Sequence, residues 1–176
     1  MSAANPWLEE WPWPDKKMPR DTLYARIEHL LVMANIGVLS TSGKNGPIGS
    51  PVEYTAEGLT IFLYPQPGSP KLAAIARDPR VCFAVHASVG NWVSCRGAQL
   101  FGEAQMLQPG TQAWEHGMAV LPWEANAVEL GRDRNSPPND PIMRIEPDRV
   151  VYTEHWMRRD GYAPRQIWRR DPPNQS

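Results

Sequence analysis

A short stretch near the middle of the chain, Ser69-Pro70-Lys71, combines three residue types that suit the binding of an anion. Serine is a preferred N-cap residue and proline suits the first helical position, so we expect a helix to begin here. The free N–H groups and the positive dipole end of that helix would lie beside the Ser69 hydroxyl and the Lys71 ammonium group. The sequence therefore indicates a phosphate or carboxylate site at this helix start.

Position, rather than charge alone, distinguishes Lys71 from the other lysines. The chain has four lysines, and the other three lie in a proline-rich N-terminal arm or in a turn, where exposed charges are ordinary: Lys16, Lys17 and Lys44. In the plainer alternative, Ser69 only caps the helix and Lys71 is solvated. A charge-assisted hydrogen bond contributes about 1.5–3 kcal/mol, so two or three of them would hold a phosphate-bearing cofactor without a metal ion.

The remaining candidate residues form no metal-binding or nucleophilic motif. The four histidines are scattered, and Cys82 and Cys95 lack a Cys-x-x-Cys arrangement, so we predict no metal site. We expect the two cysteines on neighbouring strands, where they could lie near one another, as free thiols in a reducing compartment. The sequence contains no Gly-x-Ser-x-Gly, Gly-x-Gly-x-x-Gly or Walker motif. The helix start at Ser69 is therefore the feature that carries chemistry.

Charge and hydropathy narrow the class of partner. The chain has 18 Lys and Arg residues against 19 Asp and Glu residues, a formal net charge of -1, which gives no general attraction to nucleic acid or anionic lipid. No apolar run reaches the ~18 residues of a membrane span, and residues 1–17 lack the apolar stretch of a signal peptide. We therefore expect a cytoplasmic protein with a small-molecule partner, bound neither to nucleic acid nor to a membrane.

The hydrophobic spacing predicts the elements that position this helix start. After Asp21, a candidate N-cap, apolar residues at helical spacing predict an amphipathic helix to about Met33. A short helix is expected over 69–80, another helix around 111–121, and a loop over 122–141. Alternating apolar residues between turn signals predict strands over 36–42, 49–55, 59–64, 81–87, 92–107, 142–146 and 149–155, the last two separated by a turn at Pro147-Asp148.

This order of elements describes a mainly β protein, in which a mostly antiparallel barrel has helices at its rim. With 176 residues, the chain fits a single domain. We divide it into a Pro/Trp-rich N-terminal arm at residues 1–20, a barrel domain at residues 21–156 and an Arg/Trp-rich C-terminal tail at residues 157–176. Such barrels serve many functions, so the function must be argued from the site.

Roughly the middle third of the chain resembles the FMN-binding split barrels of the pyridoxamine 5'-phosphate oxidase-like family. The matching segments are Gly-Pro-x-x-Ser-Pro-Val from Gly46, Glu-Gly-Leu-Thr-Ile-Phe-Leu-Tyr from Glu57, Gly-Ser-Pro-Lys-Leu-Ala-Ala-Ile-Ala-Arg-Asp-Pro-Arg-Val from Gly68, and Gly-Glu-Ala from Gly102. The Ser-x-Lys helix start followed by Asp-Pro-Arg-Val is the most specific piece. The resemblance implies an antiparallel six-stranded split β-barrel with peripheral helices, bound FMN and a homodimer with flavin at its interface.

The resemblance also implies which residues contact the cofactor. In that family the Ser and Lys of the helix start bind the flavin phosphate, which implies this role for Ser69 and Lys71. The second strand runs along the ribityl chain and the ring, the end of the next strand lies near the phosphate, and a strand of the second subunit reaches the ring. The residues implied for these three positions are Ser50, Pro51 and Val52, then Leu63 and Tyr64, then Arg96 or Gln99.

The sequence also departs from the oxidases that act on vitamin B6. Those enzymes resemble one another in an Arg and a Lys on the second strand and a C-terminal Arg-x-His set, whereas residues 49–54 are not basic and the tail has no Arg-x-His. We therefore expect an FMN-dependent oxidoreductase of unknown substrate. Its Arg-rich tail either receives the phosphates of a nicotinamide reductant or pairs with nearby acidic residues. The alternative is a non-catalytic protein that binds or carries a flavin, a deazaflavin or haem.

Overall fold

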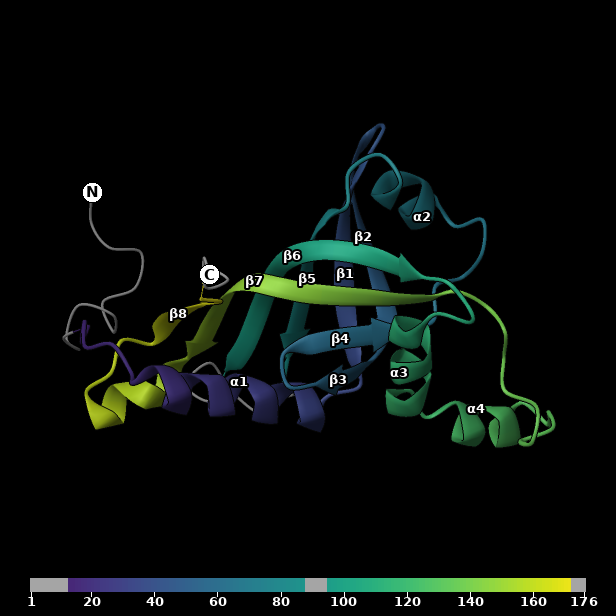
Figure 1. Ribbon diagram of the computed structural model, residues 1–176. Helices are drawn as coiled ribbons and strands as arrows, with labels where there is room; N and C mark the ends of the chain where they lie inside the picture. The colour runs from purple at the N-terminus through teal and green to yellow at the C-terminus, as the bar shows by residue number, and fades with distance from the viewer. Residues whose placement is uncertain (1–12, 88–94, 172–176) are drawn as a thin grey trace, which may run out of the picture.

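The computed structural model describes residues 13–87 and 95–171, and its centre is one curled antiparallel sheet (Figure 1). The strands are β1 (Ile36–Gly43), β2 (Gly46–Glu53), β3 (Thr55–Glu57), β4 (Thr60–Leu63), β5 (Arg80–His86), β6 (Arg96–Leu107), β7 (Ile142–Glu154) and β8 (Arg165–Arg169). The helices are α1 (Arg20–Met33), α2 (Pro70–Ile75), α3 (Gln112–Val120), α4 (Trp123–Glu129) and the 3-10 helix η3 (His155–Asp160). The strand order is β2-β1-β5-β6-β7-β4-β3, and β8 pairs with β7.

The sheet is curled because its two end strands are consecutive in the chain. Only Tyr54 separates β2 from β3, although these strands lie at opposite ends of the strand order. Tyr54 is buried, its hydroxyl donates to the Leu31 carbonyl at 2.9 Å, and its ring meets that of Phe83 edge-on. This junction brings the two sheet edges together beneath α1. The predicted split barrel with peripheral helices is confirmed, and the described residues form eight strands rather than six.

Two apolar clusters hold the helices on the sheet. The larger fills the barrel and includes the buried face of α1, namely Leu23, Ile27, Leu30 and Leu31. The smaller lies between α3 and strands β4 and β7 and consists of Phe62, Leu107, Met118, Leu121 and Ile142. Fully burying such a side chain contributes about 1.5–3 kcal/mol, so these contacts fix both helices. No helix in the described part of the chain is long and apolar enough to span a membrane.

Three predicted helix features differ from the structure. The helix predicted over 69–80 is shorter, because α2 ends at Ile75. Helix α1 begins at Arg20, so the N-cap position belongs to Pro19, which has no side-chain acceptor, and Asp21 lies in the first turn. The predicted helix around 111–121 is confirmed as α3, where the Thr111 hydroxyl accepts the Trp114 N–H at 3.2 Å. The predicted loop 122–141 is wrong in its first part, because Trp123–Glu129 forms α4. Its missing N-cap side chain explains why no start signal was visible.

The predicted turn at Pro147-Asp148 is wrong, because β7 continues through these residues as one long strand. The ladder between β6 and β7 shifts register here: Phe101 faces Arg149 and Gly102 faces Pro147, which leaves Asp148 as an unpaired extra residue. This is a β-bulge, which places one additional residue in a strand and bends it. Pro147 has no N–H to donate to the ladder, so a bulge accommodates it without a turn.

Gly102 is required by this bulge, and replacing it with alanine is expected to destabilise the fold. A Cβ atom at Gly102 would overlap the Glu146 carbonyl oxygen and lie 2.9 Å from Pro147 Cα, so the backbone of β7 would have to move. We expect Gly102→Ala to lower the free energy of unfolding by about 1–3 kcal/mol in urea denaturation. Gly49→Ala is the matched control, since its Cβ would meet only Val38 Cγ1, at 3.6 Å. Equal stability of the two variants would contradict this role.

The C-terminal segment belongs to the sheet. Strand β8 pairs with β7 from Arg149–Arg169 to Thr153–Arg165, and both Met157 and Trp168 are buried. The described part of the N-terminal arm lies against it: the Met18 N–H donates to Gln166 Oε1 at 3.1 Å. These segments lie at the end of the sheet opposite α3 and α4 (Figure 1).

The two cysteines are free thiols, as predicted, but they are not neighbours. Cys82 faces Phe101 across the β5–β6 ladder, whereas Cys95 immediately precedes Arg96, which faces Glu154 on β7. Five residues of β6, 96–100, therefore separate Cys95 from Phe101, the position opposite Cys82. Burial raises the pKa of the Cys82 thiol, which keeps it protonated and unreactive at neutral pH.

Candidate functional site

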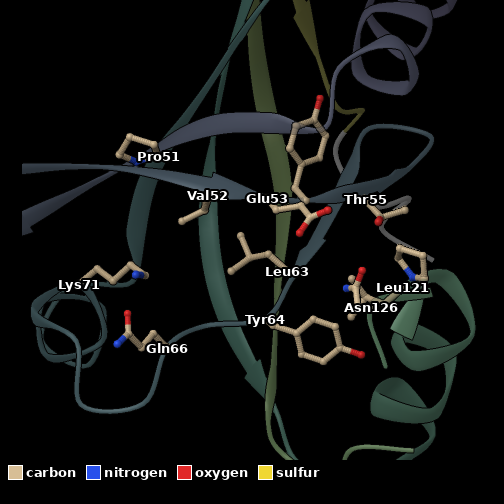
Figure 2. A pocket seen from close by; sticks show the side chains of 12 residues that line it. Pro51, Val52, Glu53, Thr55, Leu63, Tyr64, Gln66, Lys71, Leu121 and Asn126 are labelled. Carbon is tan, nitrogen blue, oxygen red and sulfur yellow. The ribbon is translucent and has the colours of Figure 1, made fainter. Parts of the chain in front are cut away.

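A cleft of about 240 Å³ lies where the two edges of the sheet separate, between the end of β2 and the end of β4 (Figure 2). Beyond Tyr54 these edges are not paired with one another, so the barrel is open on this side. Three further segments complete the walls: the loop before α2, the first turn of α2, and the α3–α4 junction. The lining residues are Pro51, Val52, Glu53, Tyr54, Thr55, Leu63, Tyr64, Gln66, Lys71, Leu121, Pro122 and Asn126.

Five of the residues implied by the family resemblance come together in this cleft. Pro51 and Val52 reach it from β2, Leu63 and Tyr64 from the end of β4, and Lys71 from α2. Ser50 precedes this stretch on β2, and Ser69 lies two residues before Lys71; neither lines the cleft itself. The other two candidates, Arg96 and Gln99, lie on β6 near the middle of the strand order, so the same chain does not bring them into the cleft.

Ser69 occupies the predicted N-cap position of α2, but its side chain does not cap the helix. Its backbone carbonyl accepts the Leu72 N–H at 3.0 Å, while its hydroxyl oxygen is buried and has no hydrogen-bond partner among the described residues. Buried polar groups are nearly always hydrogen-bonded, so an unpartnered hydroxyl needs an explanation. A phosphate oxygen at this helix start would supply the missing partner.

The middle of the cleft is apolar and bordered by a tyrosine. Val52 and Leu63 approach it from the two sheet edges, and Tyr64 lies below them (Figure 2). The Tyr64 hydroxyl donates to Met118 Sδ at 3.4 Å, which orients the ring toward α3. Burial raises the pKa of Tyr64 to about 12, so its hydroxyl stays neutral at physiological pH. This arrangement suits a flat apolar group between the sheet edges.

Sequence reasoning missed several lining residues. Gln66 lies beside Lys71 at one end of the cleft, and Asn126 with Leu121 forms the other end (Figure 2). Gln66 lies in a loop with no motif of its own. Asn126 belongs to α4, a helix that the sequence did not predict, so no signal pointed to it. The cleft thus has hydrogen-bonding groups at both ends and apolar side chains between them.

The lining fits a flavin better than haem or a metal ion. The Lys71 ammonium group, the Gln66 amide and the nearby Ser69 hydroxyl can bind a phosphate, while Val52 and Leu63 can contact a ring system. None of the lining residues is a His, Cys or Met, the side chains that most often hold haem iron. In the described part of the chain, no three His, Cys, Asp or Glu residues are grouped to hold a metal ion.

Comparisons with solved structures show the same fold. A putative pyridoxamine 5'-phosphate oxidase from Listeria innocua is 19% identical, with a TM-score of 0.57 over 74% of this chain and 97% of that one. A heme binding protein from Mycobacterium smegmatis is 20% identical, with a TM-score of 0.63 over 88% of this chain and 60% of that one. An FAD binding protein from the same organism is 13% identical, with a TM-score of 0.54 over 84% and 96%.

The sequence comparison identifies the family directly. No curated protein matches the chain. The sequence profile of the Pyridoxamine 5'-phosphate oxidase family, however, matches residues 23–154, about three quarters of the chain. That range holds every strand of the barrel except β8, together with the cleft and the helix start at Ser69. The chain is therefore a member of the pyridoxamine 5'-phosphate oxidase-like family.

Proposed function

We propose that this protein binds FMN in the cleft and acts as a cytoplasmic FMN-dependent oxidoreductase. One observation carries the proposal: the fold gathers Val52, Leu63, Tyr64 and Lys71 from three separate segments into one cleft, next to the unpartnered Ser69 hydroxyl. FMN has the phosphate and the flat ring that these groups suit. When bound, it would supply two-electron redox chemistry, which requires few catalytic side chains.

The residues of the cleft have separate tasks in this proposal. Lys71 and Ser69 hold the phosphate, the Lys71 charge offsetting that of the anion and the hydroxyl contributing a hydrogen bond. Val52 and Leu63 contact the ring and exclude water from its face. The neutral Tyr64 hydroxyl, held by Met118, keeps the end of β4 in place at neutral pH. Glu53 is the one carboxylate among the described lining residues, and it is exposed, so the proposal gives no residue a role in proton transfer.

A homodimer is part of the proposal, and the small volume of the cleft supports it. The cleft holds about 240 Å³, whereas ligand sites span roughly 300–1,000 Å³. It lies beside β2, which is an end strand of the sheet and is largely exposed. A second copy against this side would enlarge the site and could bring Arg96 or Gln99 to the ring. Light scattering would test this: a monomeric FMN-bound protein would contradict it.

The structure changes the hypothesis that the C-terminal tail binds the phosphates of a nicotinamide reductant. Strand β8 and its arginines lie at the far end of the sheet from the cleft (Figure 1), so within one chain they do not reach it. Arg170 lies 3.9 Å from Glu146, and Asp171 pairs with Arg20 at 2.9 Å, which supports a structural role instead. If the tail binds the reductant, it does so across the dimer. In anaerobic stopped-flow experiments, Arg165→Ala with Arg169→Ala would then slow reduction by NADPH; unchanged rates would reject this binding role.

The competing function is a non-catalytic carrier of a flavin, a deazaflavin or haem. The near absence of acid–base groups in the lining is compatible with it. The absorbance spectrum after incubation with FMN and gel filtration separates the cofactors: retained flavin bands support the proposal, and a Soret band after incubation with haem indicates the alternative. A flavin-loaded protein that neither accepts electrons from NADH or NADPH nor passes them to quinones would be a carrier.

A further inference from the structure

A second cavity, of about 460 Å³, adjoins the cleft on the side of α4. We call it the α4 bay. It shares Glu53, Tyr64 and Asn126 with the cleft, so any molecule in the bay lies next to whatever fills the cleft. Its other walls are α4 and the segment 130–140, neither of which the sequence predicted as part of a site.

Hydrogen bonds hold the outer wall of the bay in place. The Trp114 indole N–H, on α3, donates to the Asp140 carbonyl at 2.9 Å and ties the end of the segment to the core. The Arg132 N–H donates to the Ala127 carbonyl at 2.8 Å, and the Asn135 N–H donates to Asp133 Oδ1 at 2.9 Å. The bay is therefore formed by a folded wall, although the segment 130–140 has no regular secondary structure.

The inner surface of the bay is mainly apolar and aromatic. Tyr64 and Trp123 both line it, together with Ala127 and Leu130. Trp123 is half-buried and packs against the cluster that includes Phe62 and Met118, which limits its movement. Leu130 is 67% exposed, so its side chain adds accessible apolar surface beside the cavity. Aromatic side chains in these positions offer flat surfaces to a planar ligand.

The charges around the bay disfavour anions. Glu53, Glu129 and Asp140 line it, against one cation, Arg132. Within the described residues, none of these four side chains takes part in a hydrogen bond or an ion pair, so the three carboxylates are not neutralised. The three carboxylates and one guanidinium give the bay a formal charge of -2. A negatively charged ligand would be repelled by this charge at short range.

We propose that the α4 bay is the substrate pocket of this protein and takes a planar, apolar molecule that carries no negative charge. This inference rests on the proposed function, since it places the substrate beside the flavin. It also separates the protein from oxidases of phosphorylated vitamin B6, whose substrates are anionic. Trp123 is the specificity-determining residue, and Glu129 and Asp140 select against anions.

Three naphthalene probes with the same ring and different charges test the proposal: naphthylmethanol, naphthylmethylamine and naphthoate. Isothermal titration calorimetry on the FMN-loaded protein should give dissociation constants for the alcohol and the amine at least about fivefold lower than for naphthoate. Trp123→Ala should weaken binding of the alcohol about tenfold, while Trp123→Phe retains most of it. Trp156→Ala, an exposed tryptophan on η3, is the matched control and should change nothing.

A second variant tests the charge of the bay without changing a side chain of the apolar core. Glu129→Gln with Asp140→Asn alters two exposed side chains, so folding is preserved, and it should bring the affinity for naphthoate close to that for the alcohol. Tight binding of naphthoate to the original protein, or equal affinities in the Trp123 and Trp156 variants, would overturn the proposal. A protein that binds the probes through Trp123 but retains no FMN would refute the proposed function and leave the bay as a binding site.

Discussion

Replacing Lys71 with alanine is expected to weaken FMN binding about tenfold or more, measured by the quenching of FMN fluorescence on titration with protein. Among the described residues that line the cleft, Lys71 carries the one cationic group, and a charge-assisted contact to a phosphate contributes about 1.5–3 kcal/mol. A tenfold change in affinity corresponds to about 1.4 kcal/mol. Lys44→Ala, in the turn between β1 and β2, is the control and should bind FMN like the original protein. Equal affinities of both variants would place the phosphate elsewhere.

Ser69→Ala tests the other half of the phosphate site and separates binding from stability. Because the Ser69 hydroxyl has no partner among the described residues, its removal breaks none of their hydrogen bonds, and the free energy of unfolding of the FMN-free protein should change by less than about 0.5 kcal/mol. FMN affinity should nevertheless fall about tenfold, since the bound phosphate loses a donor. A variant that loses stability but keeps its FMN affinity would show that the Ser69 hydroxyl contributes to the fold and not to phosphate binding.

Local signals in the sequence were sufficient to predict the helix start that borders the cleft. Proline fixes its own backbone and serine is a preferred N-cap, so the start of α2 was predictable from Ser69-Pro70. The sequence did not show that the Ser69 side chain would leave the helix uncapped. That outcome depends on how β4 and α2 are placed by the core, which is a property of tertiary packing.

The errors arose where tertiary contacts overrode local chemistry. Pro147-Asp148 has the composition of a turn, yet the close approach of Gly102 allows a bulge there and β7 continues. Helix α4 begins after Pro122 without a capping side chain, and its buried residue is Ala127, so neither a start signal nor a strong apolar stripe identified it. The α4 bay depends on this helix, and for that reason no signal in the sequence pointed to the bay.

Neutralising Glu154, at the end of β7, should destabilise the fold. Its Oε2 atom accepts from Arg26 Nη1 on α1 and from the Tyr152 hydroxyl, each at 2.8 Å. The Glu154 residue is 8% exposed and Tyr152 is fully buried, so water cannot replace the carboxylate. Burial, and secondly this hydrogen bond, raises the pKa of Tyr152, which keeps the hydroxyl protonated as a donor. The Glu154 carboxylate therefore accepts hydrogen bonds from one side chain of α1 and one of β7.

Glu154→Gln should lower the free energy of unfolding by about 2–3 kcal/mol, because the amide keeps the shape but not the charge that Arg26 and Tyr152 require. Arg26 is partly exposed, which keeps the loss below that of a fully buried ion pair. The melting temperature should fall by about 4–12 °C. Glu146→Gln makes the same chemical change on the same strand, at an exposed carboxylate that pairs with Arg144 at 3.1 Å, and should lose less than about 1 kcal/mol. If urea denaturation at neutral pH gave equal losses for the two variants, the contacts of Glu154 with Arg26 and Tyr152 would contribute no more than an exposed ion pair.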